Sequence, residues 1–125
     1  MNLNQVTVPS ENVAESVDFY KRLGLRQIVE TSEDYARFEC PDGDSTFSVH
    51  RVDRVREGFG AVVYFECEEL DRTVRDLKAQ GIVFESDPEN QRWLWREARL
   101  RDPSGNVLCL YHAGANRRNP PWRIP

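Results

Sequence analysis

The chain has 125 residues, of which 39% are hydrophobic and 30% charged, and it carries a net charge of −4. This size and composition predict one ordinary globular domain, residues 1–125, too short for two independent hydrophobic cores. The acidic balance excludes the basic surface typical of nucleic-acid binders, because the main basic cluster, Arg117, Arg118 and Arg123, lies in a proline-rich tail.

The sequence shows no apolar run long enough to span a membrane, and residues 1–10 lack the basic region and apolar core of a signal peptide. We therefore expect a cytoplasmic protein that has neither a membrane nor a nucleic acid as its partner. Cys40, Cys67 and Cys109 are odd in number and widely spaced, which argues against a disulfide framework and a cysteine zinc site. We expect them to be small buried residues.

The first half of the chain predicts a strand, a helix and three further strands. Alternating residues indicate the first strand, and Ser10 is the expected N-cap of a helix that ends at Gly24. The turn PDGD at residues 41–44 separates the last two strands. The expected strands cover residues 3–8, 25–30, 35–40 and 46–52. Together they form one βαβββ unit of about residues 1–57.

The second half repeats this order in a unit of about residues 58–112. Apolar residues at helical spacing, among them Leu70, Val74 and Leu77, predict a helix that ends at Gly81. The turn DPSGN at residues 102–106 combines proline, glycine and side chains that bond their own backbone, so it predicts a hairpin. The expected strands cover residues 61–67, 82–85, 93–101 and 107–112. Residues 113–125 are rich in Asn, Arg and Pro, and we expect them to form an ordered or semi-ordered tail on the surface.

The tandem units, the motif SVDFYKRLGL at residues 16–25 and the motif RDPSGN at residues 101–106 resemble the vicinal oxygen chelate superfamily. That superfamily includes glyoxalase I, the bleomycin-resistance proteins and the extradiol dioxygenases. The resemblance covers residues 3–112 and implies an α+β fold, in which each unit is a curved mixed sheet with a helix on its convex face. It also implies a pocket enclosed by the two concave faces, and a homodimer.

Period-two alternation indicates which side chains face that pocket, because the helix side of each strand should be apolar. The positions assigned to the helix side are Val6, Val8, Ala36, Phe38, Phe47, Val49, Leu94, Ala98, Leu100, Leu108 and Leu110. The expected ligand-binding residues are Gln5, Tyr35, Arg37, Ser48, His50, Phe65, Trp93, Trp95, Arg99, Cys109 and Tyr111. For Ser48 and His50, an alignment that superposes the two turns gives the opposite assignment.

Metal-dependent members of the superfamily take ligands from the first and last strands of each unit. Matched by position, the resemblance places them at Gln5, Ala61, Cys109 and either Ser48 or Phe47. These residues do not supply the nitrogen and oxygen donors that a catalytic divalent ion needs. We therefore favour no cofactor.

An off-pattern metal site is the alternative. It would use Gln5, His50 and Glu97 to hold Ni, Zn, Mn or Fe, although alternation alone does not show that the three side chains converge. Glu97 is also the candidate catalytic residue, as a general acid or base, and an ion pair with Arg99 on the same face is the competing interpretation.

The first functional interpretation is a small-molecule-binding protein of this superfamily, without the usual complete metal site, that binds an aromatic or anionic compound. Whether the protein is an enzyme stays open, and catalysis would be of the glyoxalase-like lyase or isomerase type. The alternative is a divalent-metal-dependent lyase or isomerase built on Gln5, His50 and Glu97.

Overall fold

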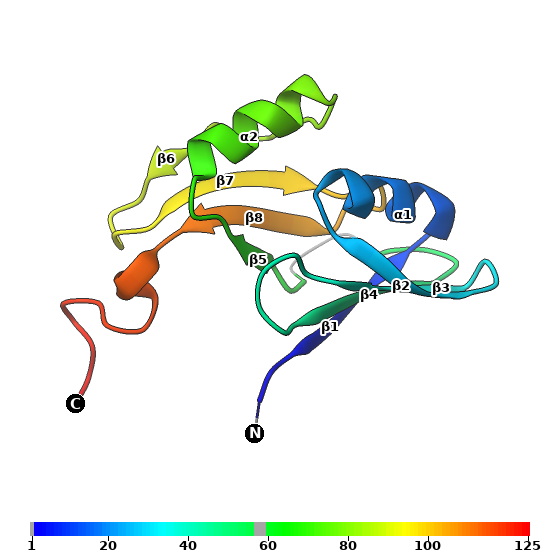
Figure 1. Cartoon of the computed structure of the whole chain (residues 1–125), viewed down its shortest axis with the longest axis horizontal. Coiled ribbons are helices and arrows are strands. Elements are labelled where there is room, and N and C mark those ends of the chain that lie inside the picture. Colours follow the sequence, from blue (N-terminus) through cyan, green and yellow to red (C-terminus); the bar gives the residue numbers. More distant parts are fainter. Residues whose placement is uncertain (1, 57–59) are drawn as a thin grey trace. The chain divides into compact units, whose positions relative to one another are not determined.

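The computed structural model describes residues 2–56 and 60–125 and contains two four-stranded mixed sheets, each with one helix (Figure 1). Contacts divide the chain into unit 1, Met1–Gly60 with Asp102–Asn106, and unit 2, Ala61–Arg101 with Val107–Pro125. Both units have the order βαβββ, so the predicted α+β fold is confirmed. The predicted boundary at residues 57 and 58 lies outside the described residues.

Unit 1 forms one mixed sheet in the order β1-β4-β3-β2. Strand β1 runs parallel to β4, and the other neighbours are antiparallel. The elements are β1 (Gln5–Ser10), α1 (Val13–Arg22), β2 (Arg26–Thr31), β3 (Tyr35–Glu39) and β4 (Thr46–Arg51).

Helix α1 begins two residues later than the sequence predicts. Its N-cap is Asn12, whose side-chain oxygen accepts a hydrogen bond from the backbone N–H of Glu15 at 3.1 Å. The prediction of Ser10 as the cap is wrong, because Ser10 is the last residue of β1. Its buried hydroxyl instead shares a hydrogen bond of 2.6 Å with Ser16. The helix ends as predicted before Gly24, whose positive φ of 101° suits a residue without a side chain.

The core of unit 1 lies between α1 and the sheet. The Tyr20 ring of α1 packs against Phe47 of β4 and Phe38 of β3, with centroids 4.6 and 5.9 Å apart. Val49 and Ala36 are also buried, and they alternate with polar neighbours along their strands. The helix side of β3 and β4 is therefore the one that alternation predicts, and Ser48 lies on the opposite face.

The turn Asp102–Asn106 belongs to unit 1 by its contacts, although it joins two strands of unit 2. Buried Asp102 accepts a hydrogen bond of 2.7 Å from the Tyr20 hydroxyl and a second of 2.7 Å from the Asn106 side chain. The Asn106 amide also donates to the carbonyl of Pro9 at 2.8 Å. The Ser104 hydroxyl accepts a bond from the backbone N–H of Glu11 at 2.9 Å. These bonds fix the turn to unit 1.

Unit 2 forms a mixed sheet in the order β5-β8-β7-β6, with α2 along one face (Figure 1). Leu70, Val74 and Leu77 of the helix are buried, as their spacing predicts. The elements are β5 (Val63–Glu66), α2 (Leu70–Ala79), β6 (Glu89–Asn90), β7 (Arg96–Arg101) and β8 (Val107–His112).

Two strand predictions in unit 2 are corrected by the structure. Residues 82–85 make a single bridge, Phe84 with Leu100, and the edge strand is the later β6. Strand β7 starts at Arg96 instead of residue 93, because the chain turns at Leu94, where φ is +66° and the backbone N–H bonds the carbonyl of Gln91. Leu94 is 48% exposed and was wrongly assigned to the apolar face.

The tail that follows β8 is anchored by one carboxylate. Residues Gly114–Arg117 form a short 3₁₀ helix. Glu66 of β5 accepts hydrogen bonds from the backbone N–H groups of Ala113 and Gly114 at 2.7 and 2.9 Å, the groups that a helix start leaves without partners. No helix in the described part of the chain is long and apolar enough to cross a membrane.

Candidate functional site

The two units carry matching positions that can be read from the strand pairing. Phe38 pairs with Phe47 in unit 1, and Leu100 pairs with Leu108 in unit 2. With these core pairs superposed, the segment YARF at residues 35–38 matches EARL at residues 97–100. Arg37 therefore corresponds to Arg99. The further matches on the face away from the helix are Tyr35 with Glu97, Ser48 with Cys109, His50 with Tyr111 and Thr7 with Tyr64.

In unit 1 the face opposite α1 carries a chain of polar side chains. The Gln5 amide donates to the Ser48 hydroxyl at 2.7 Å, and the Ser48 and Tyr35 hydroxyls lie 2.8 Å apart. The Arg37 Nε–H donates to the Tyr35 oxygen at 2.8 Å. Thr46 donates to Oε1 of Gln5, which directs the Gln5 amide nitrogen towards Ser48. Four predicted ligand residues are thus in contact.

Strand register explains this cluster. Arg37 pairs with Ser48 across β3 and β4, and Thr7 pairs with Ser48 across β1 and β4. Residues two apart on a strand point to the same face, so Tyr35 joins Arg37 there. His50 is paired with Tyr35 through the backbone, but its exposed side chain makes no hydrogen bond or ion pair with the rest of the described chain.

The bonds around Tyr35 favour its ionised form. The hydrogen bond with Ser48, then the hydrogen bond and positive charge of Arg37, hold the pKa of Tyr35 below its ordinary value, although partial burial opposes them. The Arg37 guanidinium carbon also lies 5.5 Å from the centre of the Tyr35 ring. A phenol and a cation are therefore held together on a half-exposed surface.

In unit 2 the face opposite α2 carries three aromatic rings. Trp95 stacks on Tyr111 with centroids 4.7 Å apart and planes at 22°. Tyr64 meets both rings edge-on, at 5.8 Å from Trp95 and 5.5 Å from Tyr111. The Tyr64 hydroxyl also accepts a hydrogen bond from Arg99 at 3.4 Å. This group, Tyr64, Trp95 and Tyr111, is the aromatic cluster of unit 2.

The sequence predicted Phe65 as a ligand-binding residue of β5, whereas Tyr64 was not predicted. Phe65 pairs with Leu110, and Val63 of the same face pairs with Leu108, so the register puts Phe65 on the side of α2. Strand β5 has only four residues, and its alternation is hidden because Tyr64 and Phe65 are both aromatic. The pairing of Tyr64 with Cys109 shows that Tyr64 lies on the face opposite α2, and this pairing cannot be read from the sequence of β5 alone.

Glu97 lies at the centre of a second group in unit 2 and is 3% exposed. Its Oε2 accepts a bond of 2.5 Å from the Trp93 indole. Its Oε1 lies 3.4 Å from the Cys109 sulfur and 3.5 Å from Arg99. Both oxygens are therefore engaged, and proton exchange with a ligand would require these bonds to open. The ion pair with Arg99 is present, and the catalytic role of Glu97 stays a prediction.

Cys109 is buried, and its environment disfavours the thiolate. Burial first, and then the charge and hydrogen bond of Glu97, raise the pKa of Cys109 to about 12. The Cys109 thiol is therefore protonated near neutral pH, which makes it a poor nucleophile.

We expect Cys109 to resist thiol reagents in the folded protein. A native protein treated with a disulfide-exchange reagent at pH 8 should leave Cys109 unmodified, as mapped by peptide mass spectrometry, whereas the unfolded chain should react at all three cysteines. Modification of native Cys109 at the rate of the unfolded chain would show that the thiol is accessible and ionised.

The positions of the usual metal ligands do not fit a metal. Register makes Val62, instead of the predicted Ala61, the counterpart of Gln5, since Val63 pairs with Leu108 as Val6 pairs with Phe47. The last-strand positions are Ser48 and Cys109. An amide, an apolar side chain, a serine and a buried thiol form a poor set for a divalent ion.

Among residues 2–56 and 60–125 no three His, Cys, Asp or Glu side chains are grouped as a metal site requires. The off-pattern site of Gln5, His50 and Glu97 stays a prediction that elemental analysis can test. After the protein has been incubated with nickel, zinc, manganese or iron and passed through gel filtration, we expect less than one metal ion per chain. Stoichiometric binding that is lost in both Gln5→Ala and His50→Ala, but kept in His112→Ala, would establish that site.

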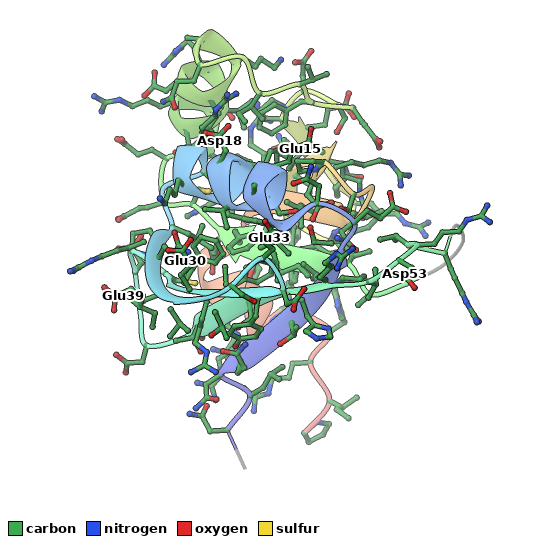
Figure 2. The ribbon with its side chains drawn as sticks, turned by 90° about the vertical axis from the view of Figure 1, so that its right-hand side faces the viewer. Glu15, Asp18, Glu30, Glu33, Glu39 and Asp53 are labelled. Carbon is green, nitrogen blue, oxygen red and sulfur yellow. The ribbon has the colours of Figure 1, made fainter. Side chains whose placement is uncertain are left out.

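Unit 1 also has an open groove of about 600 Å³ on its helix side, between α1 and the β2–β3 hairpin. Figure 2 shows Glu15 and Asp18 on α1 and Glu30 and Glu33 on the hairpin side. Glu30 and Glu33 line the groove, whereas of the predicted unit 1 ligand residues only Tyr35 does. Lys21 and Arg51 line the same groove, so its charge is mixed.

Comparisons with known proteins place this architecture among glyoxalase-like folds. A structure described as a "glyoxalase/ bleomycin resistance protein/ dioxygenase from Nocardioides" superposes with a TM-score of 0.78 at 20% identity, covering 100% of this chain and 90% of that one. The lactoylglutathione lyase from Agrobacterium tumefaciens superposes with a TM-score of 0.74 at 16% identity, covering 89% and 92%. At these identities the likeness concerns the fold alone.

Two sequence comparisons agree with the fold. A Bacillus subtilis (strain 168) protein named "Uncharacterized protein YraH" is 28% identical over 127 residues, which cover 89% of this chain and 98% of that protein. A family profile matches residues 2–110, and it includes both motifs on which the resemblance was based. The chain belongs to the Glyoxalase/Bleomycin resistance protein/Dioxygenase superfamily.

Proposed function

We propose that the protein binds an aromatic or anionic small molecule on the sheet faces opposite α1 and α2. This proposal rests on one observation: each unit places an arginine beside an aromatic side chain. Arg37 lies over the Tyr35 ring and donates to its hydroxyl, and Arg99 contacts the Tyr64 hydroxyl. An arginine and an aromatic ring together suit a planar organic anion.

The two arginines differ in how far their charge is already compensated. Arg99 is 40% exposed and contacts Glu97 at 3.5 Å. Arg37 is exposed and takes part in no ion pair among the described residues. Its Nε is engaged by Tyr35, and its two terminal nitrogens make no hydrogen bond with the described chain. Arg37 therefore has two terminal nitrogens, with four N–H groups in a planar fork, to offer to a carboxylate or phosphate.

The aromatic cluster of unit 2 supports the aromatic part of the proposal. Stacked Trp95 and Tyr111 lie on the face opposite α2, where Tyr111 is buried in a small apolar cluster with Cys109 and Ala113 and Trp95 packs against that cluster. Catalysis, where present, is expected to be of the lyase or isomerase type, and a metal is not part of the proposal.

Tryptophan fluorescence tests the proposed function. In a Trp122→Phe protein, which removes the exposed tail indole, aromatic carboxylates should quench emission in a saturable way. The response should be largely lost when Trp95→Phe is added. A library of aromatic and anionic compounds that leaves the emission unchanged would refute the proposal.

We also propose a homodimer, which rests on the family resemblance. Sedimentation velocity at micromolar concentration should give a mass near twice 14.6 kDa. A single species of 14.6 kDa would reject the dimer.

A further inference from the structure

The polar chain of unit 1 directs its donors towards one atom, the Tyr35 oxygen. Because the Gln5 oxygen accepts the Thr46 hydroxyl, the amide nitrogen is the end that faces Ser48, and it donates to the Ser48 hydroxyl at 2.7 Å. The Ser48 and Tyr35 hydroxyls lie 2.8 Å apart and either can donate; we take the arrangement in which Ser48 donates and Tyr35 accepts. The Arg37 Nε–H supplies the second donor, also at 2.8 Å.

Two donors fill both lone pairs of a neutral phenol oxygen. The proton of Tyr35 itself then has no acceptor among the described residues, and it is directed away from Ser48 and Arg37. Tyr35 is half-buried, so this proton is accessible to a bound molecule. If the proton leaves, the phenolate keeps both donors and the adjacent positive charge, which stabilise it.

We propose that Tyr35 is a proton-transfer residue, held by the chain Gln5, Ser48 and Arg37, and that its substrate is an organic anion with an exchangeable proton near the charged oxygen. The inference rests on the proposed function, because it assigns chemistry to the same face. The terminal nitrogens of Arg37 hold the anion, and the Tyr35 oxygen lies 2.8 Å from Nε of the same guanidinium.

The proposed step conserves protons, because Tyr35 returns the proton that it takes. The Tyr35 phenolate takes a proton from a carbon next to a carbonyl group of the bound anion, and the electron pair of the broken C–H bond is delocalised onto that carbonyl oxygen while Arg37 holds the carboxylate. Return of the proton from Tyr35 to a different ligand atom gives the tautomer and restores the phenolate. No oxidant, reductant or metal is needed.

The ligand-free protein tests the inference first, by pH titration of the tyrosinate absorption band. The chain has four tyrosines. The pKa of Tyr20 is raised by burial and by Asp102, and the pKa of Tyr111 is raised by burial and by Glu66. We therefore expect an early phase of about one quarter of the total amplitude, which disappears in Tyr35→Phe.

Matched variants separate the role of the donor chain from the mere presence of a phenol. Arg37→Gln and Ser48→Ala should each move the early phase to higher pH, whereas Arg51→Gln, an exposed arginine of β4 that pairs with Asp34, should leave it in place. Tyr64→Phe should also keep it. The inference is overturned if the early phase persists in Tyr35→Phe, or if Arg37→Gln and Arg51→Gln titrate alike.

Phenylpyruvate, an aromatic anion with exchangeable C–H protons, tests the chemistry. Its methylene signal in D₂O, followed by proton NMR, should disappear faster with the wild-type protein than spontaneously, and Tyr35→Phe should lose this acceleration. Equal rates with wild-type and Tyr35→Phe would reject the proton-transfer role, even where fluorescence quenching demonstrates binding. Failure of the proposed function is distinguishable, because it appears as the absence of any quenching ligand.

Discussion

Replacement of Asp102 by alanine is expected to lower the free energy of unfolding by about 3 kcal/mol. The buried carboxylate accepts bonds from Tyr20, from the Asn106 side chain and from the backbone N–H groups of Ser104 and Asn106. Alanine would leave the Tyr20 hydroxyl, on a side chain that is fully buried, without its acceptor. Urea unfolding followed by circular dichroism measures the effect.

The first turn of the chain provides the control for this prediction. Asp42 lies in the weaker copy of the turn, at residues 41–44, and is exposed. Asp42→Ala should change stability by less than about 0.5 kcal/mol. Tyr20→Phe removes one bond without creating a cavity and should cost about 1 kcal/mol. Equal stability of Asp102→Ala and Asp42→Ala would show that the network does not stabilise the fold.

Replacement of Arg37 by glutamine is expected to weaken binding of an aromatic carboxylate by about tenfold or more, because a charge-assisted pair is worth about 1.5–3 kcal/mol. Arg99→Gln should have a smaller effect, since its charge is partly compensated by Glu97 before any ligand arrives. Isothermal titration calorimetry of each variant gives the dissociation constants.

Arg51→Gln controls for the loss of one positive charge from unit 1, because Arg51 is exposed and paired with Asp34. Its affinity should stay within about twofold of the wild-type value, as for a screened surface charge. Arg37→Gln and Arg51→Gln proteins that bind the carboxylate equally well would exclude a specific contact with Arg37.

The fold could be predicted from the sequence because its signals are local and repeated. The turn DPSGN, the helix ends at Gly24 and Gly81, and the alternation of β3, β4 and β8 each depend on neighbouring residues. The errors arose where a tertiary contact overrides the local pattern. Ser10 was predicted to cap the helix, but it is the last residue of β1 and its hydroxyl bonds Ser16. Strand β7 is shorter than predicted because the chain turns at Leu94.

The candidate site was only partly predictable, because its chemistry depends on register. Alternation placed Gln5, Tyr35, Arg37 and Ser48 on one face, but it did not show that their polar atoms form a single chain. The incorrect prediction of Phe65 instead of Tyr64 also arose because the strand register was unknown. A shift of one residue in β5 reverses which ring faces Cys109, and only the pairing of two strands fixes it.

In the proposed complex, this protein holds an organic anion through an arginine that lies beside an aromatic side chain. Isothermal titration calorimetry with matched pairs of aromatic carboxylates and their primary amides tests this, because the members of a pair differ in charge and little in shape. We predict that at least one carboxylate binds about tenfold more tightly than its amide, and that Arg37→Gln removes this preference. Equal binding of carboxylate and amide in every pair, or a preference that Arg37→Gln leaves unchanged, would show that Arg37 does not hold the anion.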